Sequence, residues 1–161
     1  MRILLVDDDP ILALLAEIAL EEDGHQIVGP AYDAEEALRL TETNAIDLAL
    51  VDINLSGHDE GVDLAQLLHE RFDVFSLFVS GQVDVAKANT RYAVGLLAKP
   101  YTPHDLSRSV HIVHALVKGE LPLTLSIPSP LTLFTDSTGL YAPLDGSTLH
   151  GRTQHDRIRA R

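Results

Sequence analysis

The chain has 161 residues, no cysteine and a formal net charge of −12 at pH 7. The lack of cysteine excludes disulfide frameworks, thiol catalysis and cysteine-based zinc sites, and the acidic balance disfavours binding to nucleic-acid phosphates. The whole excess lies in residues 1–119, with 20 Asp or Glu against 8 Lys or Arg, because residues 120–161 hold four of each kind.

The first predicted elements are a strand and a long helix. The strand covers Arg2–Val6, and Asp9-Pro10 then reads as an N-cap followed by a proline in the first helical turn. The helix continues to about Asp23, where Gly24 ends it. Apolar residues at helical spacing form one face, which we expect to lie in the core: Ile11, Leu14, Leu15 and Ile18.

A second strand, Gln26–Ala31, contains Gly29-Pro30. We expect it at a sheet edge, because proline cannot donate a hydrogen bond to a ladder. The spacing of Asp33 and Glu36 fits a capping box and predicts a helix to about Thr43. The short apolar run that closes at Asp52 then reads as a buried parallel strand.

The second half continues the alternation of strands and helices. The last helix begins after Thr102, a cap followed by proline and an acid at the third helical position, and it closes at Lys118-Gly119. Alternating elements with right-handed crossovers predict a doubly wound α/β fold with a five-stranded parallel sheet. The remaining expected elements are a helix over about Val62–Arg71, a strand Val74–Ser80, a weak helix Val83–Arg91 and a strand Val94–Ala98.

Polar side chains follow four of the predicted strands at their carboxyl ends, where open α/β sheets bind ligands. They are Asp7 and Asp8, Asp52, Ser80 and Lys99. Carboxylates that converge there repel one another unless a hard cation such as Mg²⁺ binds, and an ammonium and a hydroxyl can hold phosphoryl oxygens. This set predicts reversible phosphorylation of Asp52, in which positioning and charge neutralisation do most of the catalysis.

The ordered motifs resemble the receiver domain of bacterial two-component response regulators over residues 1 to about 119. They are Val6-Asp7-Asp8-Asp9-Pro10, Asp52, Ser80-Gly81 and Lys99-Pro100. The resemblance implies a flavodoxin-like or CheY-like sheet order of 2-1-3-4-5. It also implies phosphotransfer from a histidine kinase or a histidine phosphotransfer protein.

The resemblance further implies a role for each residue. Asp52 is the phosphoacceptor, Asp8 a direct ligand of Mg²⁺ or Mn²⁺, and Asp7 a ligand acting largely through water. The backbone carbonyl of Asn54 completes the metal ligands together with Asp52. Ser80 and Lys99 bind the phosphoryl group, and the Lys99–Pro100 peptide bond is expected to be cis.

Such a domain is a phosphoacceptor and not an enzyme, beyond self-phosphorylation from small donors and autodephosphorylation. We expect output through protein–protein contacts or as a phosphate sink, with homodimerisation left open and no direct nucleic-acid binding. No apolar run approaches the roughly 20 residues of a membrane helix. A strand follows Met1 directly and leaves no room for a signal peptide, so we expect a cytoplasmic protein.

Two departures from the family bear on switching. Leu96 stands where the family usually has the Tyr or Phe of its switch, and Phe78-Val-Ser-Gly81 resembles a single-domain branch with Phe-x-Ser/Thr-Gly and no aromatic switch residue. The loop after Asp52 lacks the usual proline and is one residue longer to Gly61. We therefore hypothesise that phosphorylation reorders this loop and the weak helix over residues 83–91.

Two other functions compete with the receiver. A haloacid dehalogenase-like phosphatase would use Asp7 as nucleophile and Asp9 as general acid, but Pro10 and Ile11 break its pattern and Asp52 would be unexplained. A degenerate receiver acting as a binding module conflicts with the intact set of site residues. His111 and His114, three apart on the last helix, form no pattern with acids and are not expected to bind metal.

Residues 120–161 form a proline-containing tail with no effector domain. Leucines alternate with polar residues from Leu121 to Leu133, a strand-like period, and prolines confine such a strand to an edge or a docked segment. Two interpretations stay open, a flexible terminus and a segment that packs on the last helix or on a sister subunit. From His150 onward we expect disorder.

Overall fold

The computed structural model describes residues 1–120 and 126–134. Its sheet runs in the order β2-β1-β3-β4-β5-β6, and the first five strands are parallel, so the predicted doubly wound fold of order 2-1-3-4-5 is confirmed. No helix in the described ranges is long and apolar enough to cross a membrane. The strands are β1 (Arg2–Val6), β2 (Gln26–Ala31), β3 (Leu48–Val51), β4 (Ser76–Ser80), β5 (Gly95–Ala98) and β6 (Leu131–Leu133).

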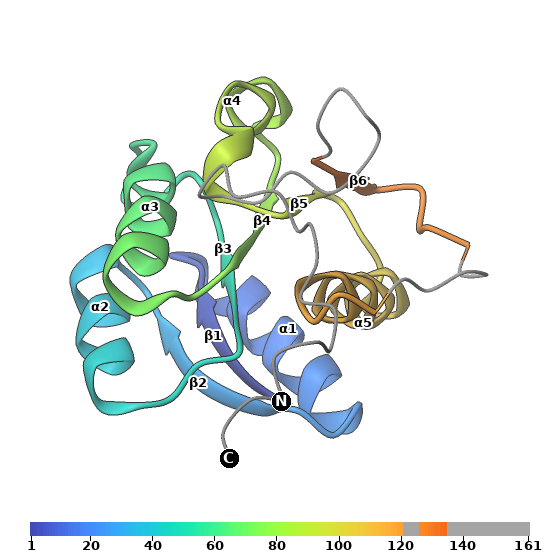
Figure 1. Cartoon of the computed structure of the whole chain (residues 1–161), viewed down its shortest axis with the longest axis horizontal. Coiled ribbons are helices and arrows are strands. Elements are labelled where there is room, and N and C mark those ends of the chain that lie inside the picture. Colours follow the sequence, from blue (N-terminus) through green and yellow to red (C-terminus); the bar gives the residue numbers. More distant parts are fainter. Residues whose placement is uncertain (121–125, 135–161) are drawn as a thin grey trace, which may run out of the picture.

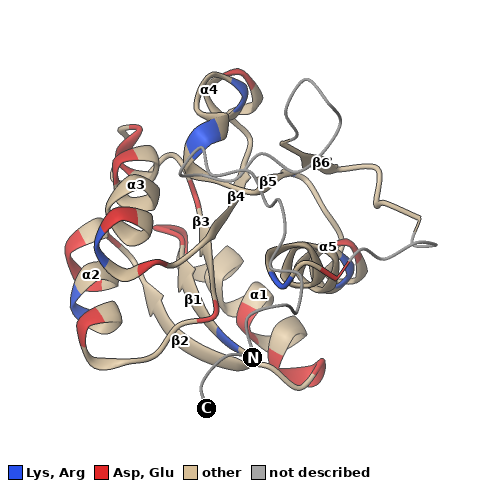
Figure 2. Ribbon diagram, viewed as in Figure 1, with Lys and Arg blue, Asp and Glu red and all other residues tan. Residues whose placement is uncertain are grey.

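Helices cover both faces of the sheet, with α1 and α5 on one face and α2, α3 and α4 on the other (Figure 1). Acidic residues are spread over α1, α2 and α3, which agrees with the charge balance of this part of the chain (Figure 2). The helices are α1 (Pro10–Glu22), α2 (Ala34–Thr43), α3 (Glu60–Phe72), α4 (Val83–Ala88) and α5 (Pro103–Val117).

Helix starts follow the predicted caps. The Asp9 carboxylate accepts hydrogen bonds from the amides of Ile11 and Leu12, at 2.9 and 3.2 Å, and Thr102 forms a capping box with Asp105. The predicted weak helix over residues 83–91 is shorter than expected, because α4 ends at Ala88 and a 3₁₀ turn covers Thr90–Tyr92. A short α4 fits a segment with little apolar periodicity.

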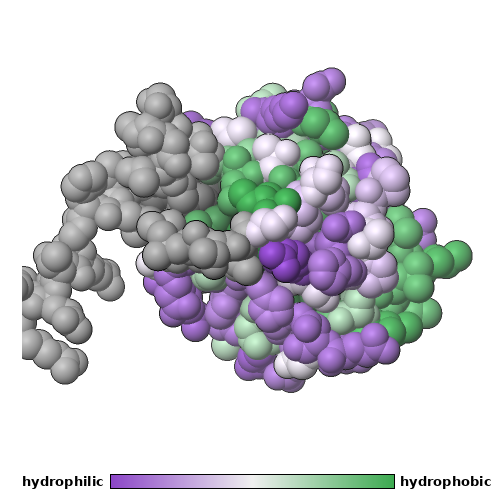
Figure 3. Space-filling model, turned by 90° about the vertical axis from the view of Figure 1, so that its right-hand side faces the viewer, coloured by the Kyte–Doolittle hydropathy of each residue, from purple (hydrophilic) through white to green (hydrophobic). Residues whose placement is uncertain are grey.

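The predicted core face of α1 is wrong. Ile11 and Leu15 are 69% and 57% exposed, and Leu14 and Ile18 are also exposed. Figure 3 views the molecule from the side of α5 and β6 and shows hydrophobic side chains at its surface. The buried residues of α1 are Ala13, Ala16 and Leu20. Because this helix is apolar on more than one side, periodicity could not identify the buried face, and the small alanines are the ones that pack against the sheet.

A sixth strand, β6, pairs antiparallel with β5 and extends the predicted five-stranded sheet. The Ala98 amide donates to the Pro130 carbonyl and the Phe134 amide to the Val94 carbonyl, both at 2.9 Å. A side chain at Gly95 would bring its Cβ to 2.5 Å from the Thr132 carbonyl oxygen, so glycine permits this close approach.

The expected edge strand of the tail is therefore found at residues 131–133, beside β5. The Arg108 guanidinium, on α5, donates a hydrogen bond of 2.9 Å to the Ser126 carbonyl and ties the incoming segment to that helix. The predictions for residues 121–125 and for the chain from His150 onward fall outside the described residues.

Candidate functional site

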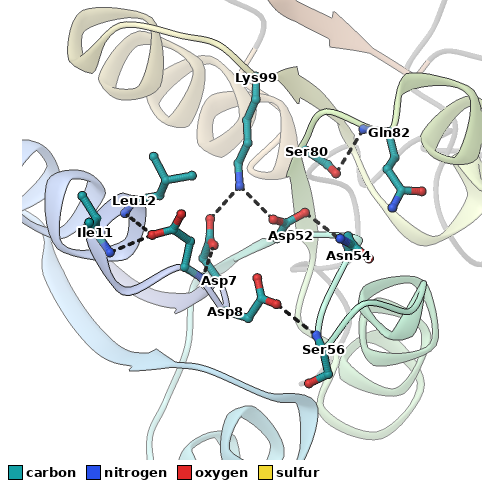
Figure 4. Close-up of polar contacts among 11 residues, drawn as sticks. Asp7, Asp8, Ile11, Leu12, Asp52, Asn54, Ser56, Ser80, Gln82 and Lys99 are labelled. Carbon is teal, nitrogen blue, oxygen red and sulfur yellow. Dashed lines mark hydrogen bonds and ion pairs between the residues drawn. The ribbon is translucent and has the colours of Figure 1, made fainter.

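The carboxyl ends of β1, β3, β4 and β5 bring the predicted site residues to one rim of the sheet (Figure 4). Parallel strands in neighbouring positions present their ends side by side, which is why residues far apart in sequence meet here. Asp7 and Asp52 are buried, with 5% and 8% of their surface exposed, whereas Asp8 is exposed. Ser80 is buried and Lys99 is half-buried.

The Lys99 ammonium joins two of these carboxylates. Its Nζ donates hydrogen bonds of 2.8 Å to Asp7 Oδ2 and to Asp52 Oδ2. Only a fifth of the Lys99 side chain is exposed, so both ion pairs are largely shielded from water. Charge-assisted hydrogen bonds of this kind hold the two acids and the lysine in a defined arrangement.

Backbone amides hold the second oxygen of each buried carboxylate. The Asp9 amide donates to Asp7 Oδ1 at 2.9 Å, and the Asn54 amide donates to Asp52 Oδ1 at 3.1 Å. The exposed Asp8 accepts a hydrogen bond of 3.1 Å from the Ser56 amide, which ties the β1 rim to the loop after β3. The carboxylates are therefore oriented by the fold, as a preorganised site requires.

Ser80 sits at the end of β4, across the rim from Lys99. Its hydroxyl oxygen accepts a hydrogen bond of 3.2 Å from the Gln82 amide. The Lys99 amide donates to the Ser80 carbonyl at 3.1 Å, so β4 and β5 end in register at the site. The Lys99–Pro100 peptide bond that follows is cis, as the resemblance implies.

Two further residues shape the surroundings of the site. A Cβ at Gly61 would collide with the backbone of Asp52 and Ile53, so a glycine there lets the start of α3 pack against the end of β3. Leu96, at the position usually occupied by an aromatic switch residue, is only 1% exposed and pairs with Phe78 of β4. It is part of the core, where a bulky side chain has no second place to go.

Burial and charge shift two pKa values at the rim in the same direction. Burial raises the pKa of Asp7 above its usual value, although the hydrogen bond from Lys99 opposes this shift. Burial by itself lowers the pKa of Lys99, but its hydrogen bonds to Asp52 and Asp7 outweigh that effect, so the net pKa lies above the usual value. Lys99 therefore stays charged at neutral pH.

The three carboxylates fit a divalent cation. One oxygen from each of Asp7, Asp8 and Asp52 lies within 4.8 Å of the others. Three carboxylates and one ammonium leave a net charge of −2, which a divalent ion would neutralise. Carboxylate oxygens are the ligands that Mg²⁺ and Mn²⁺ prefer, so the donor set suits the cation that the resemblance implies.

The burial of the Asp7 charge, with a smaller effect of repulsion from Asp52, predicts that removing this acid stabilises the fold. Because the pKa of Asp7 is raised on folding, its contribution to stability falls as the pH rises from the unfolded-state pKa through the folded-state pKa. We expect Asp7→Asn to raise the free energy of unfolding at pH 7 without Mg²⁺, and to raise it less near pH 4, where part of the wild-type Asp7 is already protonated.

Urea unfolding at both pH values measures this difference. Asp9→Asn is the matched control, because asparagine caps a helix as well as aspartate does and should leave stability nearly unchanged. A loss of stability in Asp7→Asn at pH 7 would show that the ion pair with Lys99 outweighs the cost of burying the charge.

Sequence reasoning missed a second cluster of polar side chains. His111 does have an acidic partner, contrary to the expectation above, because its Nε2 lies 2.7 Å from Asp23 Oδ2. His25 lies beside the same carboxylate. Asp23 and His111 are 88 residues apart, and no local spacing in the sequence connects them.

Comparison with known proteins gives the same picture as the geometry. A family model described as "Response regulator receiver domain" matches residues 3–111. The transcriptional regulatory protein PdtaR of Mycobacterium tuberculosis is 32% identical over 115 residues, which are 69% of this chain and 55% of PdtaR.

Solved structures similar to this chain include the following two. A CheY-like receiver domain protein from Methanospirillum hungatei has 28% identity and a TM-score of 0.63, over 74% of this chain and 97% of that one. The response regulator TrrA from Thermotoga maritima, in complex with Mg²⁺-BeF, has 25% identity and a TM-score of 0.60, over 70% and 97%. The chain spans about half the length of the first curated relatives it matches, 46% and 55%.

Proposed function

Because this chain belongs to the response regulator receiver domain family, whose members act in phosphorylation-controlled signalling, we propose that Asp52 is its phosphoacceptor. The observation that carries the proposal is the position of Asp52 at the end of β3, with one oxygen held by Lys99 and the other by the Asn54 amide. Asp7, at the end of β1, has a similar pair of donors in Lys99 and the Asp9 amide, so the choice of Asp52 rests also on the resemblance to receiver domains, which assigns the nucleophile to the end of β3.

The proposed reaction is a transfer from phosphohistidine to aspartate. A carboxylate oxygen of Asp52 attacks phosphorus, the new P–O bond forms as the P–N bond breaks, and the imidazole of the donor leaves. Lys99 and Ser80 contribute by binding phosphoryl oxygens, the ammonium with its charge and the hydroxyl as a donor. This role requires the Lys99 ammonium to move from Asp7 and Asp52 toward the incoming group.

Receiver domains bind Mg²⁺ at an acidic pocket, and we propose that Asp7, Asp8 and Asp52 hold it here, with the Asn54 carbonyl as a further ligand. Asp7 would act largely through water. The bound ion supplies positive charge next to the phosphoryl oxygens. The complex of the similar protein TrrA with Mg²⁺-BeF supports this assignment by analogy.

The test is treatment of the full chain with acetyl phosphate, with and without Mg²⁺. We expect a mass increase of one phosphoryl group that needs Mg²⁺ and does not form when a chelator is present from the start. Peptide mapping should place the modification on Asp52. Phosphorylation of Asp7 would instead favour the phosphatase hypothesis, and no modification at all would favour a degenerate receiver.

We also propose that the exposed apolar face of α1 receives the protein phosphodonor. This face consists of Ile11, Leu14, Leu15 and Ile18, and α1 begins only two residues after Asp8. An exposed apolar stripe at helical spacing is suited to packing against a helix of a partner. A donor helix seated there would lie next to the rim that holds Asp52.

Replacing Leu14 with Gln is expected to lower the rate of phosphotransfer from a phosphorylated histidine phosphotransfer protein by about tenfold, because it places a polar group at the contact. Labelling by acetyl phosphate needs no docking and should change little. Ile127→Gln, at another exposed apolar residue, is the matched control. Equal transfer rates for Leu14→Gln and the wild type would exclude the α1 face.

The output of the whole protein is also a proposal. We propose that residues 1–119 form the receiver and that phosphorylation acts through protein–protein contacts or by draining phosphoryl groups from a shared donor. We also propose that the chain acts in the cytoplasm, where it would meet a phosphodonor such as a histidine kinase. From the acidic charge balance of the chain, we propose that it does not bind nucleic acid directly.

A further inference from the structure

Three side chains of metal-ligating type meet at the end of the molecule opposite the phosphoacceptor rim. Asp23 is the C-cap of α1, His25 precedes β2, and His111 lies on α5. His111 Nε2 is 2.7 Å and His25 Nε2 is 3.5 Å from the same oxygen, Asp23 Oδ2. One donor atom from each residue lies within 4.8 Å of the other two.

The buried nitrogen of His25 needs a partner. The His25 side chain is only 6% exposed, and its Nε2 has no hydrogen-bond partner among residues 1–120 and 126–134. It lies near the Asp23 carboxylate without the geometry of a hydrogen bond, and its ring is 5.3 Å from that of His111. Buried polar groups are nearly always satisfied, so an unpaired nitrogen that lies within 4.8 Å of two other ligand atoms calls for a bound group between them.

We propose that His25, His111 and Asp23 bind a transition-metal ion of the Zn²⁺ type. Two imidazoles and one carboxylate are a donor set for Zn²⁺, Co²⁺ or Ni²⁺ and not for Mg²⁺, which prefers oxygen ligands. Zinc bonds of about 2.0–2.2 Å in a tetrahedral site put the ligand atoms roughly 3.4 Å apart. The observed 2.7 and 3.5 Å therefore need only sub-ångström adjustment.

The exposure of the three residues suits an open site. The His25 side chain is buried at the base of the site, whereas half of the His111 side chain and a third of the Asp23 side chain are exposed. An ion can therefore enter from solvent, and a water molecule can occupy the fourth position. A bound ion would connect the end of α1 and the start of β2 to α5. It would stabilise the fold and fix α1, the helix whose apolar face we assign to the phosphodonor.

The experiment is titration of the untagged full chain with Co²⁺, followed by visible absorption, in excess Mg²⁺ that occupies the acidic rim. We expect one Co²⁺ per chain and the absorption of a low-coordinate nitrogen and oxygen site. Zn²⁺ should displace the Co²⁺. At a hundredfold excess over its dissociation constant, Zn²⁺ should raise the melting temperature by roughly 5–10 °C.

Three variants separate this site from others. His111→Gln changes an exposed residue and should weaken Co²⁺ binding by at least about tenfold without loss of folding, and His25→Gln should do the same. His114→Gln, one turn further along α5 and outside the cluster, is the matched control and should bind as the wild type does. Asp8→Asn, at the acidic rim, should also leave binding unchanged.

The contrary outcomes are equally clear. Binding that survives in His111→Gln, or that is lost in Asp8→Asn, would assign the ion to another place and overturn the proposal. The absence of any Co²⁺ spectrum in the wild type would overturn it as well. Because none of these readouts depends on phosphorylation, failure of this proposal and failure of the phosphoacceptor proposal are distinguishable.

Discussion

Replacing Asp52 with Asn is expected to abolish phosphorylation of the chain by acetyl phosphate, a loss of at least roughly a hundredfold in labelling rate. An amide nitrogen or oxygen cannot replace the carboxylate oxygen as nucleophile. Asparagine nevertheless keeps the size of the side chain and can still accept a hydrogen bond from the Asn54 amide. The fold should survive, because the substitution also removes one of three crowded negative charges. Intact-protein mass spectrometry over time measures the result.

Asp7→Asn is the decisive companion variant. In the wild type, Asp7 and Asp52 each lie 2.8 Å from Lys99 Nζ, so geometry alone does not separate the two acids. If Asp52 is the nucleophile, Asp7→Asn should still be labelled, at a lower rate that excess Mg²⁺ partly restores. Labelling that persists in Asp52→Asn and disappears in Asp7→Asn would transfer the role of nucleophile to Asp7 and with it revive the phosphatase hypothesis.

Replacing Lys99 with Met is expected to have two large effects. It removes the ammonium bonded to Asp7 and Asp52, so two buried carboxylates lose this counter-charge. Breaking a buried ion pair costs about 3–5 kcal/mol, and because Lys99 is one-fifth exposed we expect a smaller loss of about 2–3 kcal/mol in the free energy of unfolding at pH 7. The rate of labelling should fall by at least about tenfold, since the phosphoryl oxygens lose a cationic partner.

The two effects of Lys99→Met respond differently to conditions. The loss of stability, measured by urea unfolding, should shrink when Mg²⁺ is added or when the pH is lowered so that the carboxylates become protonated. The loss of labelling should remain in saturating Mg²⁺. Lys87→Met, at an exposed lysine of α4, is the control. A variant as stable as the wild type without Mg²⁺ would show that the rim carboxylates do not depend on Lys99.

At the rim, the sequence was sufficient to predict which residues meet but not how they contact one another. Asp7, Asp8, Asp52, Ser80 and Lys99 each end an apolar run, and parallel strands with right-handed crossovers leave only one edge where such ends meet. Their convergence could therefore be predicted from order and spacing alone. The particular contacts could not: that Lys99 bonds to both Asp7 and Asp52, and that Asp8 is tied to Ser56, depends on side-chain conformations that only packing selects.

Helix α1 shows the opposite case. Its N-cap Asp9 and its end at Gly24 agree with the sequence prediction, because caps act through contacts within a few residues. The buried face differs from the predicted one, because apolar residues lie on several sides of this helix. The alanines, which allow close packing, are among the residues that are buried. The residues predicted to be buried therefore form an exposed apolar surface in the structure. We propose that the phosphodonor binds this surface.

The sequence by itself therefore determined the order of strands and helices, the parallel sheet and the set of polar residues that meet at one rim, since all of these follow from local periodicity, caps and the ends of strands. Only the tertiary structure decided which side of α1 faces solvent, where residues 131–133 join the sheet, and that His25 and His111 share Asp23. These features join segments distant in the chain, and the free energy that selects them comes from packing between elements, which no local pattern encodes.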